Sequence, residues 1–231
     1  MDARSYLTKV GLSVEVAAVR EAQQALWEIL EEAKKASLPA TPSALNALYT
    51  YKVPKLSPDG SCSLKGDLDP TPYDLSKVLG GRSVQNSFSL LTLDALVESV
   101  QQSAGTDWLG IYQRRELASG PALVKLAYRG VESRAEFPLT EAFAKTSNNS
   151  AVGLSGKARV LQDVKAHIDG GGAYYECDPK VLSEACLPLL DPNGKVIGIL
   201  DAESTKASHF TAERLATLVS LATECTSHLP P

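Results

Sequence analysis

The segment from Glu184 to Ser204, EACLPLLDPNGKVIGILDAES, is the feature that most constrains what this chain can fold into. Two apolar runs flank the four residues DPNG, in which proline and glycine supply the backbone angles that a tight turn requires. The segment therefore predicts an antiparallel hairpin. Because side chains alternate between the two faces of a strand, Asp201 and Glu203 are expected on one face, as are Glu184 and Cys186.

Three stretches have the apolar spacing of amphipathic helices, and they cover residues 13–37, 90–105 and 211–229. Thr92 and Thr211 are the expected N-caps of the second and third helices, and Gly105 is the expected C-terminal stop of the second. Between these helices, DWLGIYQRR and ALVKLAYRG predict two neighbouring strands joined by a Gly-Pro loop. The period of two places Trp108, Gly110 and Tyr112 on the same face.

The order of these elements is helix, two strands, a long middle segment, two hairpin strands and a final helix. That order predicts an α+β domain in which helices cover an antiparallel sheet. We expect one such domain over residues 88–228, preceded by an N-terminal extension over residues 1–87. The middle segment, residues 131–176, is expected to lie over the sheet and form a pocket, because loops of that length are usually functional.

The extension has two parts. Its helix carries an apolar stripe of Val16, Val19, Leu26, Ile29 and Leu30, with Trp27 beside it. This helix either packs on its own domain or is exchanged within a dimer. Residues 38–86 are rich in proline, including Pro39 and Pro58, and predict a wrapped connection to which no function is assigned.

Composition excludes several classes of function. The formal net charge of −4 argues against nucleic acid or an anionic membrane as the partner. No apolar run approaches the roughly 20 residues that span a bilayer, and the start MDARSYLTKV has no signal-peptide core, so a cytoplasmic location is expected. Four scattered cysteines without a CxxC pair, and three histidines without ligand spacing, argue against a disulfide scaffold and a metal site.

Three motifs in this order resemble those of free methionine-(R)-sulfoxide reductases, a family of GAF domains. DWLGIY resembles the W-x-G-F-Y strand of that family, and GKVIGILDAES resembles its I-I-G-V-L-D-I-D-S strand. ECDPKVLSEACLPL resembles its I-A-C-D-x(5)-E-I-V-L-P-L segment, with the same seven-residue step from cysteine to glutamate. The resemblance covers about residues 88–228, and it implies a GAF fold.

The resemblance also implies roles for individual residues. Cys177 corresponds to the cysteine that attacks the sulfoxide sulfur, and Asp178 follows it as in the family. The acids around the bound sulfoxide correspond to Glu184, Asp201 and Glu203, the last replacing the usual aspartate. Trp108 and Tyr112 correspond to the aromatic wall of the pocket. The alternatives are structural: the two aromatic residues are also compatible with a sheet core, and Asp201 with Glu203 with a solvated strand end.

The chain departs from the family at two upstream cysteines. Where the family has C-x-R-I-P and G-x-G-V-C-G, this chain reads SRAEFPL and NNSAVGLSG. A second thiol must nevertheless reduce the sulfenic acid that the reaction leaves on the first cysteine. Cys186 is the nearest candidate, although a buried strand cysteine is the better interpretation. Cys62 would have to reach in from its loop, and otherwise an external thiol of the glutathione or thioredoxin type is required.

These observations leave three hypotheses. The first is thiol-dependent reduction of free methionine-(R)-sulfoxide, or a similar small sulfoxide, by Cys177 in a homodimer without a bound cofactor. The second is a non-catalytic GAF module that binds a small molecule for sensing or assembly, and the missing cysteines favour it. The intact cysteine–glutamate–acid set favours the first. The third is an oligomerisation protein with a dead pocket.

Overall fold

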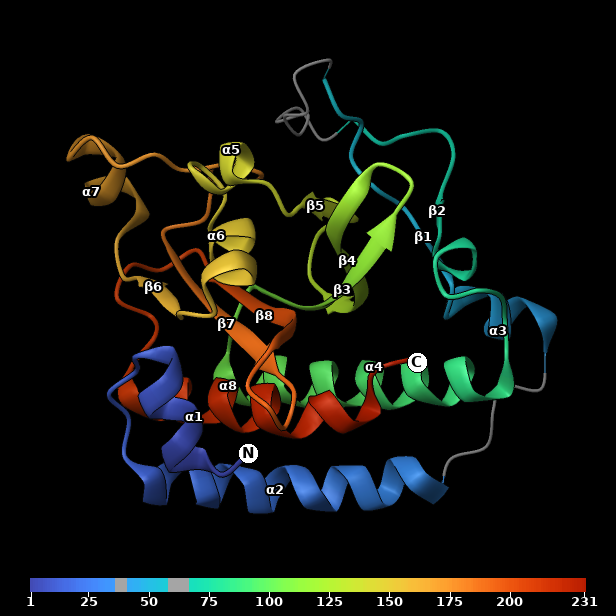
Figure 1. The fold of residues 1–231 in the computed structure, drawn as a ribbon, viewed down its shortest axis with the longest axis horizontal. Helices are drawn as coiled ribbons and strands as arrows, with labels where there is room; N and C mark the ends of the chain where they lie inside the picture. The colour runs from blue at the N-terminus through green and yellow to red at the C-terminus, as the bar shows by residue number, and fades with distance from the viewer. Residues whose placement is uncertain (36–40, 58–66) are drawn as a thin grey trace.

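The computed structural model describes residues 1–35, 41–57 and 67–231 of the chain (Figure 1). The helices are α1 (Ala3–Val10), α2 (Val16–Lys35), α3 (Pro42–Ala47), α4 (Val84–Ala104), α5 (Glu141–Ala144), α6 (Asn148–Ser155), α7 (Val164–Asp169) and α8 (Ala212–Glu224), with 3-10 turns η1 (Leu75–Lys77) and η2 (Cys225–His228). The strands are β1 (Thr50–Tyr51), β2 (Tyr73–Asp74), β3 (Trp108–Leu117), β4 (Gly120–Arg129), β5 (Glu136–Pro138), β6 (Arg159–Leu161), β7 (Ser183–Leu190) and β8 (Val196–Ser204). This is the α+β architecture that the sequence predicts.

The main sheet has six antiparallel strands in the order β5-β4-β3-β8-β7-β6. Its centre contains the predicted hairpin of β7 and β8. The Asp191 carboxylate closes the turn by accepting hydrogen bonds from the backbone N–H groups of Asn193 (2.9 Å) and Lys195 (2.8 Å). Gly194 takes a positive φ of 81°, which a side chain would strain. The hairpin and the strand pair before it are therefore confirmed.

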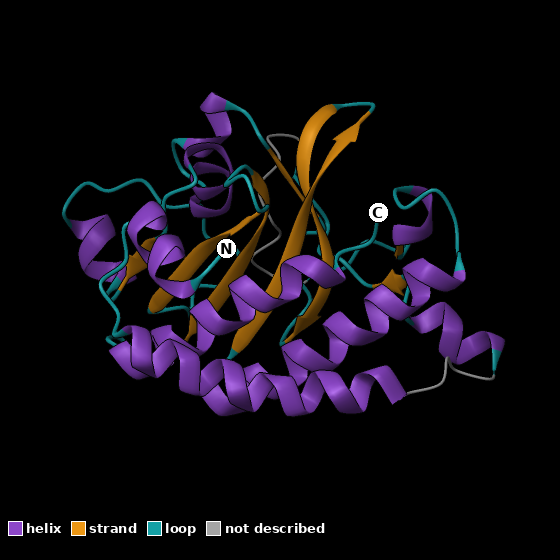
Figure 2. Ribbon diagram, turned by 60° about the horizontal axis from the view of Figure 1, so that its bottom comes forward, coloured by secondary structure: helices purple, strands orange, loops and turns teal. Residues whose placement is uncertain are grey.

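One face of the sheet packs against long helices (Figure 2). Helices α4 and α8 contact the strands, and α2 lies on the outer side of these two helices. Side chains from this face, including Leu109, Ile111, Leu187 and Leu200, join the helices in the larger hydrophobic core. This face of the sheet is therefore buried in the larger hydrophobic core.

Helix α2 packs on its own chain, as the first of the two predicted arrangements requires. Val19, Leu26 and Leu30 are buried in the larger core. The Gln23 amide donates hydrogen bonds to Thr223 Oγ1 (3.0 Å) and to a Glu224 carboxylate oxygen (3.1 Å) at the end of α8. Trp27, by contrast, is 58% exposed. The extension therefore contributes to the same core as the domain that follows it.

The start of α4 corrects one prediction. Thr92 is not an N-cap, because the helix begins at Val84 and the hydroxyl of Ser83 accepts the hydrogen bond of the Asn86 N–H (3.0 Å). The predicted N-cap lies about two and a half helical turns after the observed one. The predicted boundary between residues 87 and 88 falls inside α4, and the division into two domains stays a prediction. The caps at Gly105 and Thr211 are confirmed.

The opposite face of the sheet is covered by the middle of the chain. Helix α6 lies over β7 and β8, and α5 packs beside α6 (Figure 1). A smaller hydrophobic cluster fills this side and includes Trp108, Tyr112, Phe137 and Cys186. This face carries every predicted site residue that lies on a strand. Cys62 lies outside the described residues.

Candidate functional site

Strand register brings the predicted acids together on one face of the sheet. Glu184 on β7 pairs with Glu203 on β8, and Glu203 pairs in turn with Trp108 on β3. Asp201, two residues before Glu203, lies opposite Cys186. Because directly paired residues project from the same face, these five side chains share it, as the sequence predicts. Glu184 and Asp201 are buried, whereas Glu203 is half-buried.

The aromatic residues of β3 lie beside these acids. The ring centroids of Trp108 and Tyr112 are 6.2 Å apart, and the Trp108 indole N–H donates to the Val131 carbonyl oxygen (3.1 Å). The Tyr112 hydroxyl donates to the Arg134 carbonyl oxygen (3.3 Å). Gly110 leaves room for the indole ring, because a Cβ at this position would lie 2.2 Å from Trp108 Cη2. The glycine thus allows the Trp108 ring to lie flat along the sheet.

The two buried carboxyl groups are electrostatically coupled. Burial raises the pKa of Asp201 well above its ordinary value, and the negative charges of Glu184 and Glu203 raise it further. Burial also raises the pKa of Glu184, while a hydrogen bond from the Tyr174 hydroxyl and the charge of Arg159 oppose the rise. Two buried carboxyl groups this close disfavour simultaneous ionisation, so the pair retains a proton more readily than an isolated carboxyl group does.

Two asparagines at the start of α6 face the same carboxyl groups. The Asn149 side-chain amide donates to an Asp201 carboxylate oxygen over 3.1 Å. The Asn148 amide lies close enough to Glu184 to lower the pKa of its carboxyl group, yet neither of its polar atoms has a partner at hydrogen-bond distance. Both side chains are buried, with exposed fractions of 4% and 5%. The site thus contains polar groups that no group in the described chain satisfies fully.

Cys177 and Asp178 lie in the segment that leads from α7 to β7. Cys177 is half-buried, and its thiol is near enough to Tyr112 for its negative charge to help raise the pKa of the phenol, after burial and Asp201. Three residues earlier, Tyr174 hydrogen-bonds Glu184. The segment therefore crosses the face of the sheet that carries the acids, with Cys177 three residues after the contact with Glu184. Asp178 accepts a hydrogen bond from the Lys180 backbone N–H (2.9 Å) within its own turn.

The other two described cysteines are inaccessible. Cys186 is fully buried on β7, and burial together with the charges of Asp201 and Glu184 raises the pKa of its thiol well above the ordinary range. Burial likewise raises the pKa of Cys225, which lies in the larger core as the sequence predicts. For Cys186 the burial supports a structural role, and the alternative resolving role stays a prediction.

Two buried cations lie on the same side of the sheet. The Arg134 guanidinium is surrounded by the rings of Phe137, Phe143 and Tyr175, at 4.9 to 5.7 Å from the ring centroids, and donates to the Tyr175 hydroxyl (2.8 Å). The Lys125 ammonium lies 3.8 Å from the Tyr128 ring centroid and donates to the Ser133 carbonyl oxygen (2.8 Å). Arg134 thus contacts the segment that carries Cys177, two residues from it.

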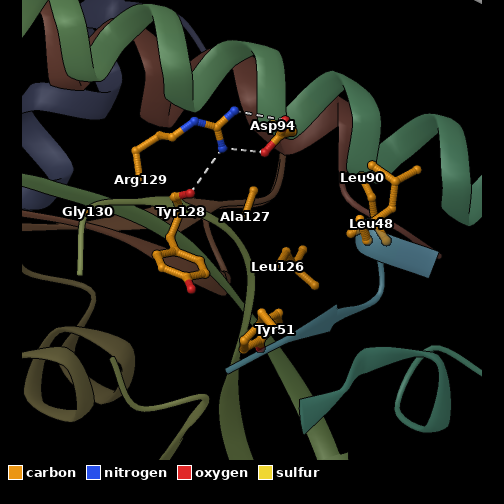
Figure 3. Close-up of a pocket in the computed structure, with 10 residues that line it drawn as sticks. Leu48, Tyr51, Leu90, Asp94, Leu126, Ala127, Tyr128, Arg129 and Gly130 are labelled. Carbon is orange, nitrogen blue, oxygen red and sulfur yellow. Dashed lines mark hydrogen bonds and ion pairs between the residues drawn. The ribbon is translucent and has the colours of Figure 1, made fainter. Parts of the chain in front are cut away.

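A separate cavity of about 380 Å³ lies at the end of β4, between α4 and the wrapped extension (Figure 3). Its floor is aliphatic, Tyr51 and Tyr128 form one side, and Arg129 closes it through ion pairs with Asp94 (2.5 Å) and Glu98 (3.2 Å). None of the predicted site residues lines it.

Several site residues were not singled out from the sequence. Tyr174, Arg159, Asn148 and Asn149 contribute to the electrostatics of the acids, and none was predicted to do so. The two asparagines lie in the segment NNSAVGLSG, which departs from the family motif, and Ser147 before them is a recognisable N-cap. In the described part of the chain, no three histidine, cysteine or acidic side chains are arranged to hold a metal ion, and no helix is long and apolar enough to span a bilayer.

The fold was also compared with known structures. A type II free methionine-R-sulfoxide reductase from Thermoplasma acidophilum is similar, with 24% identity, a TM-score of 0.53, and coverage of 62% of this chain and 94% of that chain. A free methionine-R-sulfoxide reductase from Neisseria meningitidis, solved with its substrate, has 20% identity, a TM-score of 0.48, and coverage of 76% and 96%. The GAF domain of an Acinetobacter phosphoenolpyruvate-protein phosphotransferase has 16% identity, a TM-score of 0.49, and coverage of 66% and 86%.

At these identities the similarity shows the fold alone. A search of curated proteins found no match. The model of the GAF domain family matches residues 90–229, which is more than half of the chain and includes all six strands of the sheet together with α6 and α8. The chain therefore belongs to the GAF domain family.

Proposed function

We propose that the protein reduces free methionine-(R)-sulfoxide, or a similar small sulfoxide, with Cys177 as the nucleophile. The observation that carries this proposal is the segment of Cys177, which folds over the acids so that Tyr174, three residues before Cys177, hydrogen-bonds Glu184, while the pKa of the neighbouring Asp201 carboxyl group is raised. Sulfoxide reduction by a thiol needs a nucleophilic sulfur and a proton for the departing oxygen. Asp201 supplies the proton, while Trp108 and Tyr112 contact the methyl-sulfur end of the substrate.

The reaction transfers one oxygen atom. The Cys177 thiolate attacks the sulfinyl sulfur, Asp201 protonates the sulfinyl oxygen, and that oxygen moves to Cys177. The thiol is thereby oxidised to sulfenic acid and the sulfoxide is reduced to methionine. An external thiol then attacks the sulfenic acid and releases water, and a second thiol restores Cys177 by thiol–disulfide exchange. The buried state of Cys186 favours this external route.

Activation of Cys177 requires positive charge, since carboxylates alone disfavour a thiolate. Arg134 is the candidate, because its guanidinium hydrogen-bonds Tyr175 in the same segment and is held in place by three aromatic rings. Glu184 and Glu203 serve the other end of the substrate, where a free amino acid carries an ammonium group.

Single-turnover reduction tests the proposal. Prereduced protein is mixed with free L-methionine-(R)-sulfoxide without external reductant, and methionine is quantified per protein. We expect about one equivalent from the wild type and from Cys186→Ala, and none from Cys177→Ser. If the wild type forms no methionine even with excess dithiol, the enzyme assignment fails. The non-catalytic module that binds a small molecule then becomes the better assignment.

A further inference from the structure

The first turn of α6 is fixed firmly above the acids. The Ser147 hydroxyl accepts a hydrogen bond from the Ser150 N–H (3.2 Å), and the Ser150 hydroxyl donates to the Pro138 carbonyl oxygen (2.8 Å). These contacts hold Asn148 and Asn149 over β7 and β8, where both are more than nine-tenths buried. The two side chains therefore have a defined position, which an exposed asparagine pair would lack.

Their hydrogen bonding is incomplete. Six buried side-chain polar atoms lack a partner in the described part of the chain, and four belong to this site: Asn148 Nδ2, Asn148 Oδ1, Asn149 Oδ1 and Asp201 Oδ1. Buried polar groups are almost always hydrogen-bonded, because a buried donor or acceptor without a partner destabilises the folded state. Asn148 stands out because neither its amide nitrogen nor its amide oxygen has a hydrogen-bond partner among the described residues. Such a concentration points to a bound molecule that completes the bonding.

The unsatisfied donors and acceptors indicate the chemistry of that molecule. Two amide oxygens, Asn148 Oδ1 and Asn149 Oδ1, need N–H donors, while Asn148 Nδ2 needs an acceptor. The ionisable groups that act on this pair are three acids, Glu184, Asp201 and Glu203, against one cation, Arg159, so acidic groups predominate. A negative site rich in acceptors matches an ammonium group, which has three N–H donors. Asn148 Nδ2 further requires an oxygen close to that ammonium.

We propose that Asn148 and Asn149 form an amide subsite that reads the ammonium group of a small ligand and an oxygen beside it. The subsite deepens the proposed function, on which it rests for its probe molecule. Acids select a cation of any shape, whereas two fixed amides select the pattern of donors around it. Asn148 is thus a specificity-determining residue in the pocket.

The test measures binding and stability separately from turnover. All binding is measured by calorimetry in a Cys177→Ser background, so that no substrate is consumed. The probes are L-methionine-(R)-sulfoxide and its N-acetyl derivative, which has the same oxygen and sulfur but no ammonium. The variant is Asn148→Leu, which keeps the side-chain size and removes both unmet polar atoms.

The matched control is Asn86→Leu at the start of α4. Asn86 is equally buried, at 3% exposed, but its amide donates to the carbonyl oxygens of Leu79 (3.0 Å) and Gly81 (3.0 Å). We expect Asn86→Leu to lower the melting temperature of the ligand-free protein and Asn148→Leu to leave it unchanged or raise it. Replacing a buried polar residue that has no partner without ligand should not destabilise the ligand-free protein. Replacing one whose hydrogen bonds hold the fold together should destabilise it.

We expect Asn148→Leu to weaken binding of the free sulfoxide at least tenfold. Its effect on the acetylated probe should be clearly smaller, because that probe keeps the oxygen contact but has no ammonium contact to lose. The subsite is overturned if the affinity for the free sulfoxide changes less than twofold, or if Asn148→Leu destabilises the ligand-free protein as Asn86→Leu does. The subsite is also overturned if the Cys177→Ser parent binds neither the free sulfoxide nor its N-acetyl derivative. Binding with the expected variant effects, but without turnover by the wild type, would refute the reductase and leave the subsite standing.

Discussion

Replacing Asp201 by asparagine tests the electrostatics of the site in isolation. An asparagine has nearly the same shape as a protonated aspartic acid. Its side-chain oxygen can accept the hydrogen bond that an Asp201 carboxylate oxygen now accepts from Asn149, and its NH2 group replaces Asp201 Oδ1, which has no partner among the described residues. The variant therefore keeps the packing and the hydrogen bonds of the neutral carboxyl group. It removes only the capacity to ionise.

The effect on stability follows from the raised pKa. Because the folded-state pKa of Asp201 lies above the unfolded value, the folded protein binds the proton more tightly, and stability falls as pH rises between the two values. Each pH unit in that window lowers the free energy of unfolding by about 1.4 kcal/mol for one group. The variant has no such loss. We expect Asp201→Asn to gain at least about 1–2 kcal/mol over the wild type between pH 5 and pH 8.

Asp107 provides a control of opposite sign. Its carboxylate accepts hydrogen bonds from the Thr205 backbone N–H (2.7 Å), the Thr205 hydroxyl (3.0 Å) and the Ser204 hydroxyl (3.0 Å), and these bonds lower its pKa. A depressed pKa contributes stability above the unfolded value of about 4 and loses it as pH falls through the folded one. Asp107→Asn should therefore be less stable than the wild type at pH 7, by about 1 kcal/mol after solvent screening.

Urea denaturation followed by circular dichroism at pH 5, 6, 7 and 8 measures both variants against the wild type. Parallel stability profiles for Asp201→Asn and the wild type would refute the raised pKa of this group. The same variant also tests the proposed reaction. An asparagine cannot protonate the sulfinyl oxygen, so single-turnover methionine formation should slow by about 10²–10⁴-fold without loss of fold.

Two further variant sets examine the fold around the site. Leu26→Ala should lower the free energy of unfolding by about 2–4 kcal/mol, because the Leu26 side chain is only 3% exposed. Trp27→Ala should lower it by less than about 0.5 kcal/mol, because Trp27 is 58% exposed. Equal losses in urea denaturation would contradict the packing of α2 on its own chain. Gly110→Ala should cost about 1–3 kcal/mol and shift the Trp108 emission, recorded in a Trp27→Phe background, since its Cβ would overlap the indole ring. An unchanged spectrum would contradict that contact.

The central strands could be read from the sequence because their pattern is local. The hairpin of β7 and β8 follows from one turn and two apolar runs, and alternation alone placed Asp201 with Glu203 on one face. The start of α4 could not be read in the same way. This helix contacts the sheet, α2 and α8, so apolar residues surround it and the spacing that marks one buried face becomes indistinct.

The polar partners of the acids depend on tertiary structure. Asn149 and Asp201 are 52 residues apart, and no spacing rule connects a helix start to the strand beneath it. Tyr174 reaches Glu184 only because the segment between α7 and β7 folds across the sheet. The identity of Cys177 came from a resemblance, because a lone cysteine between two acids has no distinctive pattern of its own.

Cys177 and Cys186 illustrate why position, not residue type, decides thiol chemistry in this fold. Cys186 shares the sheet face with the acids, is fully buried, and has a raised thiol pKa because the carboxylates and the apolar surroundings oppose its ionisation. Cys177 lies instead on the covering segment, where it is half-buried, and the Arg134 guanidinium contacts the same segment through Tyr175. The two thiols therefore differ because they come from different layers of the fold. The strands supply the carboxyl groups, and the segment above them supplies the thiol.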